Sequence, residues 1–184
     1  MVVGFGRMHQ GMRALLILGM LLESLGGCGY TLLGAPSDIP GKRLPLYILS
    51  FTNQTREPDL ERLITAALRH AIVQSQMFVF TADGASVTHL QGTIRRFISY
   101  PLALNSQDTV VEYRLDAAVY IRIVEATTQR LILEQEIPSS AVYLVSQSST
   151  DKVREDVAAR EAALAQLAQQ FADKCLALLA ITLL

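Results

Sequence analysis

The feature that most restricts the fold is a run of alternating apolar and polar residues between Val111 and Ile123. Its apolar members recur at every second position: Val111, Tyr113, Leu115, Ala117, Val119, Ile121 and Ile123. Charged and tyrosyl residues stand between them: Glu112, Arg114, Asp116, Tyr120 and Arg122. Successive side chains of a β-strand point to opposite faces of the sheet. The pattern therefore predicts a long strand of an antiparallel sheet, with one face buried and the other in water.

Other strand-like segments surround this one. Segments 89–100 and 131–137 precede and follow it, so the three together predict an antiparallel meander. The connection at 101–108 is longer than a tight hairpin requires. An apolar segment at 46–51 predicts a first strand, and 77–80 is interpreted either as a short second strand or as part of a loop.

Two segments carry the spacing of amphipathic helices. The first follows Pro58, which suits the first helical position because its missing N–H is not needed there. Its apolar face comprises Leu60, Leu63, Ile64, Ala67, Leu68, Ala71 and Ile72. The second begins at about Asp151, with acidic residues near its start that complement the helix dipole. Its expected inner face comprises Val153, Val157, Leu164, Leu167, Phe171, Leu178 and Leu179.

These elements predict an α+β fold of two layers. A mixed or antiparallel sheet of about four strands would carry both helices on one face, in the order β-α-β-β-β-α. The uncharged end, residues 176–184, is too short to span a membrane, and we expect it to be buried against the sheet or a partner. The length of the chain predicts a single domain at 45–184.

The beginning of the chain has the three parts of a secretory signal. Arg7 and Arg13 make the start positive, and the apolar run Ala14–Leu22 ends at Glu23. A permanent span needs about 20 apolar residues, so this run is too short to be one. We therefore interpret residues 1–27 as a signal peptide.

The sequence Leu25-Gly26-Gly27-Cys28 resembles the lipobox of bacterial lipoproteins. The resemblance implies diacylglyceryl transfer to the Cys28 thiol and cleavage before that residue, which predicts stable anchoring by more than one acyl chain. Gly29 replaces the aspartate that commonly retains lipoproteins at the inner membrane, which favours the outer membrane, on its periplasmic side. Residues 28–44 would then be the lipidated terminus and a Gly- and Pro-containing tether. The alternative is that Cys28 is a buried cysteine of a soluble domain.

Candidate catalytic groups are few. Beyond the signal, the histidines are His70 and His89, and no motif supplies either with a partner. Cys175 stands among leucines and is interpreted as a packed thiol. Glu134 and Glu136 share a strand face, but no nitrogen or sulfur ligand lies nearby in the sequence. We therefore expect no catalytic residue, metal or cofactor. An envelope hydrolase that uses a serine is the enzymatic alternative, and it would require His70 or His89.

Basic residues offer two interpretations. Removing the signal leaves 14 basic and 16 acidic residues, a net charge of −2, which argues against nucleic acid as a partner. Arg95 and Arg96 interrupt a strand-like segment, and three further arginines follow at Arg114, Arg122 and Arg130. Arginine suits bidentate binding of phosphate. Ordinary cross-strand pairing with Glu112, Asp116 or Glu134 is the simpler explanation.

The order of several short motifs resembles the LptE family of lipopolysaccharide-assembly lipoproteins. These motifs are Cys28-Gly29-Tyr30, Phe51-x-Asn53-x-Thr55-x-Glu57-Pro58, Leu90-x-Gly92, and Glu112-Tyr113 at the start of the long strand. A terminal helix with alanines and glutamines completes the resemblance, which covers nearly the whole mature chain.

The resemblance implies a non-enzymatic protein that plugs an outer-membrane β-barrel of the LptD type, assists its assembly and binds lipopolysaccharide. In the family, basic residues near the hairpin loop and near the start of the last helix contribute to that binding. The loop here offers Asn105, Ser106, Gln107 and Asp108, without a basic residue. Lys152 and Arg154 are therefore the candidates, and the charge pattern adds Arg95 and Arg96. A periplasmic accessory lipoprotein of another envelope lipid transporter is the alternative.

Overall fold

The alternating segment forms strand β5 (Val110–Glu125) in the computed structural model, which describes residues 43–81, 88–147 and 150–184. Its predicted inner residues from Leu115 to Ile123 are buried, whereas Arg122 between them is exposed. Val111 and Tyr113 are only half-buried. The prediction of a strand with one buried face is confirmed over the middle of β5.

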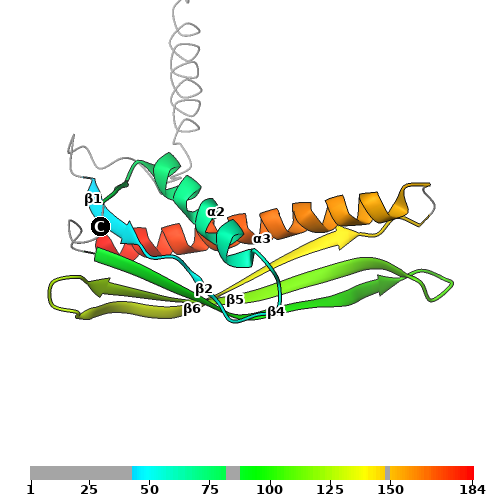
Figure 1. Cartoon of the computed structure of the whole chain (residues 1–184), viewed down its shortest axis with the longest axis horizontal. Helices are drawn as coiled ribbons and strands as arrows, with labels where there is room; N and C mark the ends of the chain where they lie inside the picture. Colours follow the sequence, from blue (N-terminus) through cyan, green and yellow to red (C-terminus); the bar gives the residue numbers. More distant parts are fainter. Residues whose placement is uncertain (1–42, 82–87, 148–149) are drawn as a thin grey trace, which may run out of the picture. The chain divides into compact units, whose positions relative to one another are not determined.

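Strands β4 (Thr88–Leu104) and β6 (Leu131–Leu144) flank β5 in antiparallel register, which confirms the meander (Figure 1). The predicted connection at 101–108 is wrong in its extent, because β4 continues through Pro101 to Leu104. Proline cannot donate a ladder hydrogen bond and is confined to edges and bulges of sheets. Beyond Ile94, β4 pairs only with β5 among the described residues, so Pro101 lies on such an edge.

Three further strands complete a six-stranded mixed sheet of order β3-β1-β4-β5-β6. Strand β1 (Leu44–Ile48) runs parallel to β3 (Phe78–Phe80) on one side and to β4 on the other. Strand β2 (Thr52–Asn53) pairs with β4. The expected count of about four strands is therefore too low. Strand β3 confirms the interpretation of 77–80 as a short strand, whereas β2, with two residues, is too short for its periodicity to identify it.

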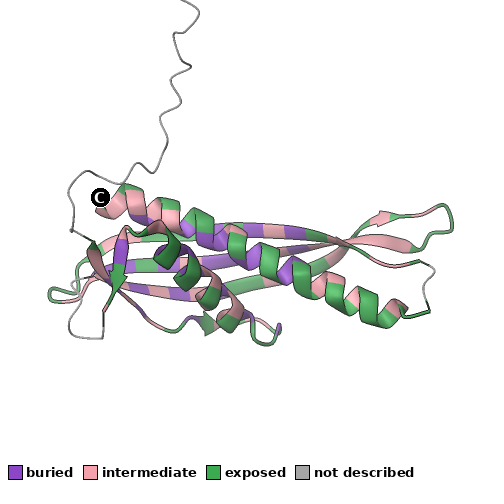
Figure 2. Ribbon diagram, turned by 90° about the horizontal axis from the view of Figure 1, so that it is seen from above, coloured by how far each residue is buried: buried purple, intermediate pink, exposed green. Residues whose placement is uncertain are grey.

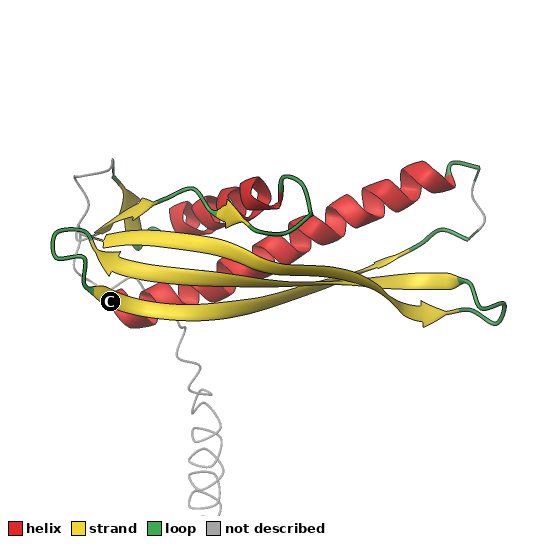
Figure 3. Ribbon diagram, turned by 60° about the horizontal axis from the view of Figure 1, so that its bottom comes forward, coloured by secondary structure: helices red, strands yellow, loops and turns green. Residues whose placement is uncertain are grey.

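Helices α2 (Leu60–Ser75) and α3 (Lys152–Leu183) lie on the same face of the sheet, as predicted (Figures 1 and 3). The buried residues of α2 all belong to its predicted apolar face: Leu60, Ile64, Leu68, Ala71 and Ile72. The helix begins at Leu60, two residues after Pro58, because Asp59 is in the left-handed conformation with φ 59° and interrupts the helix there. The prediction that Pro58 is the first helical residue is wrong.

The inner face of α3 begins later than predicted. Its buried residues are Ala163, Leu164, Leu167, Ala168, Phe171, Ala172, Cys175 and Leu179, and the alanines among them allow close packing. Val153 and Val157 are 78% and 50% exposed, because the first two turns of α3 extend past the buried core (Figure 2). At the other end, Leu179 is buried and Leu176 and Leu178 pack against the core, but Ile181 is exposed. Burial of the apolar C-terminus against the fold is therefore partial.

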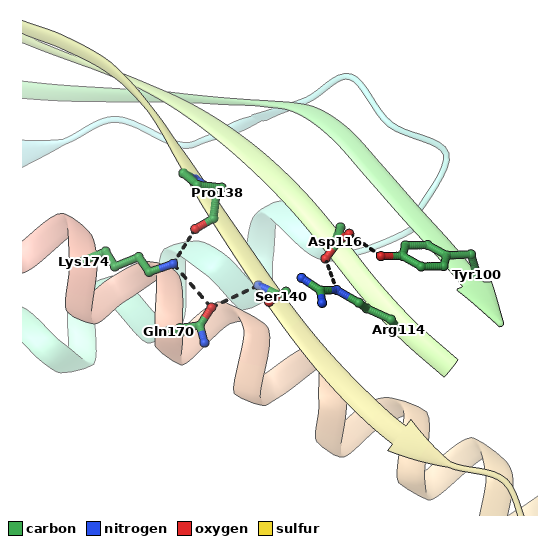
Figure 4. Close-up of polar contacts among 7 residues, drawn as sticks. All are labelled: Tyr100, Arg114, Asp116, Pro138, Ser140, Gln170 and Lys174. Carbon is green, nitrogen blue, oxygen red and sulfur yellow. Dashed lines mark hydrogen bonds and ion pairs between the residues drawn. The ribbon is translucent and has the colours of Figure 1, made fainter. Parts of the chain in front are cut away.

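Helix α3 also covers the free edge of β6 (Figure 4). The Gln170 Oε1 atom accepts a hydrogen bond of 3.0 Å from the Ser140 N–H, and the Lys174 Nζ atom donates one of 2.6 Å to the Pro138 carbonyl. Unpaired edge groups are templates for association with another strand. These two side chains occupy such groups on β6.

The signal peptide, Cys28 and most of the tether lie outside the described residues, so lipidation and anchoring stay predictions. Within the described part of the chain, neither helix has the length and apolar character required to cross a membrane.

Candidate functional site

The segment Phe51–Pro58 joins the sheet to the helices through side-chain hydrogen bonds. The Asn53 Oδ1 atom accepts from the Thr55 backbone N–H at 2.9 Å and from its hydroxyl at 2.8 Å. The Asn53 Nδ2 group donates to the Glu57 carbonyl at 2.7 Å and to Glu61 Oε2 at 2.9 Å. The polar residues of this motif therefore stabilise the turn that enters α2.

Glu57 extends this network to α3. Its carboxylate is 9% exposed and accepts a hydrogen bond from the Arg160 Nη2 group at 2.7 Å. The two residues lie 103 positions apart in the sequence. The contact fixes α3 against the turn before α2, so the motif has a structural role.

The outer face of the sheet, opposite the helices, carries Arg95 and Arg96. The register of β4 and β5 shifts between Ile94 and Arg96, which marks a β-bulge. The Arg95 guanidinium carbon lies 3.6 Å from the centroid of the Tyr120 ring, a cation–π contact. Tyr120 lies between the buried Val119 and Ile121, so its ring and Arg95 are on the outer face. Two adjacent charges in an alternating strand are the sequence signal for this bulge.

A polar cluster continues along the same face (Figure 4). The Asp116 carboxylate accepts one hydrogen bond of 2.9 Å from Arg114 Nε and another of 2.9 Å from the Tyr100 hydroxyl. The bond from Arg114 is the main reason that the pKa of Asp116 lies below its ordinary value, and the charge of Arg96 lowers it further. Conversely, the hydrogen bond to Asp116 raises the pKa of Tyr100. The cluster is ordered by its own contacts.

The other arginines considered in the sequence are paired with acids. Arg122 lies 3.8 Å from Glu134 across the strands, and Arg130 lies 3.5 Å from Glu125. The contact between Arg122 and Glu134 is the predicted cross-strand pairing. Arg114 pairs instead with Asp116 of its own strand, and Arg130 pairs with Glu125, which was not among the predicted acids. Arg95 and Arg96 differ, because they are exposed and form no ion pair with any residue that the structure describes.

The start of α3 forms a second candidate surface. Lys152 and Arg154 line an open hollow of about 450 Å³ together with Thr150, Asp151, Val153 and Val157. The Asp156 carboxylate accepts a hydrogen bond of 2.8 Å from the Ser146 N–H, which ties this part of α3 to the segment after β6. The hollow therefore combines two cationic side chains with two exposed valines.

The four predicted basic residues form two separate groups. Arg95 and Arg96 lie together on the outer sheet face, whereas Lys152 and Arg154 belong to α3 in the helix layer on the other face (Figure 1). The structure does not join them into one site. Tyr120, which orders Arg95, was not predicted as a site residue.

The residues considered for catalysis occupy ordinary positions in the fold: His70 in α2, His89 in β4 and Cys175 in α3. His70 is exposed on α2, and the half-buried His89 ring lies 5.2 Å from the Tyr47 ring. Cys175 is fully buried, as predicted for a packed thiol, and burial raises its pKa to about 12. In the described ranges, no three His, Cys, Asp or Glu side chains are grouped so that they could hold a metal.

Comparison with known proteins gives a family match and a shared fold. The sequence model of the LptE family, described as lipopolysaccharide-assembly, matches residues 45–176. No curated protein matches the sequence.

Several solved structures are similar. A protein from Xanthomonas campestris aligns with a TM-score of 0.55 at 15% identity, covering 76% of this chain and 86% of its own. A hypothetical protein from Chlamydia trachomatis gives 0.54 at 10% identity over 77% and 98% of the two chains. An uncharacterized lipoprotein B from Nitrosomonas europaea gives 0.50 at 18% identity over 77% and 88%. At these identities the likeness concerns the fold alone.

Proposed function

The chain belongs to the LptE family of lipopolysaccharide-assembly proteins, and on this premise we propose that it is a non-enzymatic outer-membrane lipoprotein that plugs an LptD-type β-barrel. In this role it assists assembly of the barrel and helps deliver lipopolysaccharide to the cell surface. The match over residues 45–176 carries the proposal, because it includes the described strands apart from Leu44 of β1, and most of α3.

Anchoring at Cys28 fits this role. Acyl chains on Cys28 would hold the domain at the periplasmic side of the outer membrane, and residues 28–44 would connect the anchor to β1. The tether would let the domain enter a barrel while it stays bound to the membrane.

The outer sheet face is suited to a barrel interior. The interior of an outer-membrane barrel is largely polar. Polar groups on this face are held in place by contacts with one another. Tyr100, Arg114 and Asp116 form a hydrogen-bonded cluster, and Arg95 stacks on Tyr120. Such groups can pair with polar side chains of a barrel wall without rearrangement.

Lipopolysaccharide offers phosphate groups beside acyl chains, and the hollow at the start of α3 has matching chemistry. Lys152 and Arg154 can bind phosphate, while Val153 and Val157 expose apolar surface beside them. We assign this hollow as the lipopolysaccharide contact, and Arg95 and Arg96, on the other face of the sheet, lie outside it.

A partner experiment tests the proposed role. The lipidated, tagged chain is expressed in its own host, the outer membrane is solubilised gently, and proteins in stoichiometric amount are identified. A large β-barrel, together with loss of surface lipopolysaccharide on depletion, supports the proposal. Recovery with inner-membrane transporter subunits, or recovery of the chain alone, contradicts it and favours an accessory role in another lipid transporter.

A binding experiment tests the hollow. Lys152→Glu combined with Arg154→Glu should reduce lipopolysaccharide binding at least about tenfold, because two favourable phosphate contacts become repulsive. Arg56→Glu combined with Arg69→Glu makes the same charge change at exposed positions away from the hollow and serves as the control. Equal losses in both variants would show that the effect is one of net charge rather than of this site.

A further inference from the structure

The outer edge of β4 is open over Arg95–Leu104. Strand β2 pairs with β4 only at Thr93 and Ile94, and no other described strand lies beside the later residues. The opposite edge of the sheet differs, because Gln170 and Lys174 of α3 bind backbone groups of β6. One edge of the meander, on β6, is therefore bound by side chains of α3, whereas the other edge, on β4, is open among the described residues.

The register shows which backbone groups this edge presents. The Val145 N–H donates to the Val111 carbonyl at 2.9 Å, so Val111 directs its backbone toward β6. Because backbone groups alternate along a strand, odd-numbered residues of β5 face β6 and even-numbered ones face β4. Phe97, Ser99 and Pro101 stand opposite the odd-numbered residues Ala117, Leu115 and Tyr113. Their own backbone groups therefore point away from β5, to the open edge.

This open segment is short and bounded at both ends. The bulge at Arg95 and Arg96 limits it on one side, and Pro101, which has no N–H, limits it on the other. Between them, Phe97 and Ser99 each offer a donor and an acceptor, and Pro101 offers an acceptor. Bulges and prolines restrain indefinite growth of a sheet, but a short strand can still pair within these limits.

The positive charge of Arg96 beside the open edge indicates which side chains a strand that pairs with β4 would carry. Arg96 is exposed and forms no ion pair with the described residues, although its charge lowers the pKa of Asp116. It lies on the outer face with Ile98, which is 45% exposed. We propose that a short extended segment of a partner protein adds to β4 between Phe97 and Pro101. This segment places an acidic side chain beside Arg96 and an apolar side chain beside Ile98.

A second copy of this chain fits the edge poorly. Antiparallel self-pairing about Ser99 would place Pro101 of each copy opposite Phe97 of the other. The Phe97 carbonyls would then have no N–H to accept from. The added strand therefore belongs to a different protein, and the inference holds whether or not that protein is a barrel.

Hydrogen exchange tests the pairing directly. The full lipidated chain is purified from its host with the proteins that accompany it, and overlapping fragments of 95–104 are compared with the chain alone. The amides of Phe97 and Ser99 should exchange at least about tenfold more slowly in the assembly. Unchanged exchange in an assembly that contains a stoichiometric partner overturns this inference but leaves the proposed function intact. Absence of any stoichiometric partner overturns both.

A variant pair gives an independent measure. Ser99→Pro removes an edge donor and should lower recovery of the partner at least about tenfold, whereas Ser99→Ala keeps the donor and should not. Thermal unfolding of both variants shows whether the domain stays folded. If Ser99→Pro unfolds the domain, the exchange measurement alone decides. If Arg96→Glu instead lowers recovery of lipopolysaccharide while amide exchange is unchanged, the edge binds phosphate rather than a strand, and the inference is wrong.

Discussion

The ring of Phe51 lies directly over Gly92, so that a β-carbon built on Gly92 would stand 2.6 Å from three ring carbons. Phe51 is 4% exposed and contacts the Phe171 ring of α3 edge-on, with ring centroids 5.8 Å apart. Two motifs distant in the sequence, Phe51-x-Asn53 and Leu90-x-Gly92, thus meet at one contact. Glycine is required here because of this close approach.

Gly92→Ala should therefore destabilise the domain by about 2 kcal/mol, as is typical of added volume in a packed core. Urea unfolding of the variant measures the change. The same substitution in a Phe51→Leu background should cost clearly less, since the smaller side chain leaves room for a methyl group. Equal costs in the two backgrounds would show that the ring is not the cause.

Arg160→Ala should destabilise the domain by about 2 kcal/mol, because it leaves the buried Glu57 carboxylate without its charged donor. Arg154→Ala removes an exposed arginine from the same helix and should change the free energy of unfolding by less than about 0.5 kcal/mol. In the double variant Glu57→Gln/Arg160→Ala, the two effects should be less than additive. Additive effects would mean that the two side chains do not stabilise the fold together.

Lowering the pH should remove the contribution of Asp116 to the free energy of unfolding. Its pKa in the folded protein is lowered, chiefly by the hydrogen bond from Arg114, so its stabilisation is present above the ordinary value of 3.8 and is lost as the pH falls through the folded value. Asp116→Asn should reduce stability near neutral pH by at most about 1 kcal/mol and flatten the decline below about pH 4. Urea unfolding at a series of pH values measures both effects, and an unchanged acid slope would contradict this assignment.

Cys175 should resist alkylation in the folded protein. Burial raises its pKa to about 12, so almost no thiolate forms at neutral pH, and the surrounding core blocks reagents. In a Cys28→Ser chain, maleimide labelling should occur only at the rate at which the domain unfolds. Ala162→Cys, at an exposed position of the same helix, provides a rapidly labelled control. Rapid labelling of Cys175 in folded protein would show that this part of α3 opens locally.

Periodicity predicted the parts of the fold that are long. β5 and the buried face of α2 follow directly from the spacing of their apolar residues. Strand β3, with three residues, is predicted only as either a strand or part of a loop, and β2, with two residues, is not predicted, because patterns of that length are ambiguous. Val153 and Val157 match the spacing of a buried face, but both are exposed, because no element that the structure describes covers the first turns of α3. The spacing of apolar residues indicates which side of a helix is apolar, but it does not indicate how far along the helix that side is packed against the rest of the fold.

The candidate site was predictable only in part. Arg95 and Arg96 were found because two adjacent charges interrupt a strand pattern, but their separation from Lys152 and Arg154 depends on which face α3 covers. The contact between Glu57 and Arg160 joins residues 103 positions apart, and no local pattern connects them.

The position of β1 has a consequence for how the domain folds. This strand is the first of the described strands in the sequence, yet it lies between β3 and β4, which are synthesised later. The meander of β4, β5 and β6 needs only contacts between consecutive strands, whereas β1 must close long loops on both sides. We therefore expect the meander to form early and β1 to insert late. The segment nearest the predicted anchor would then be the last part of the sheet to become fixed.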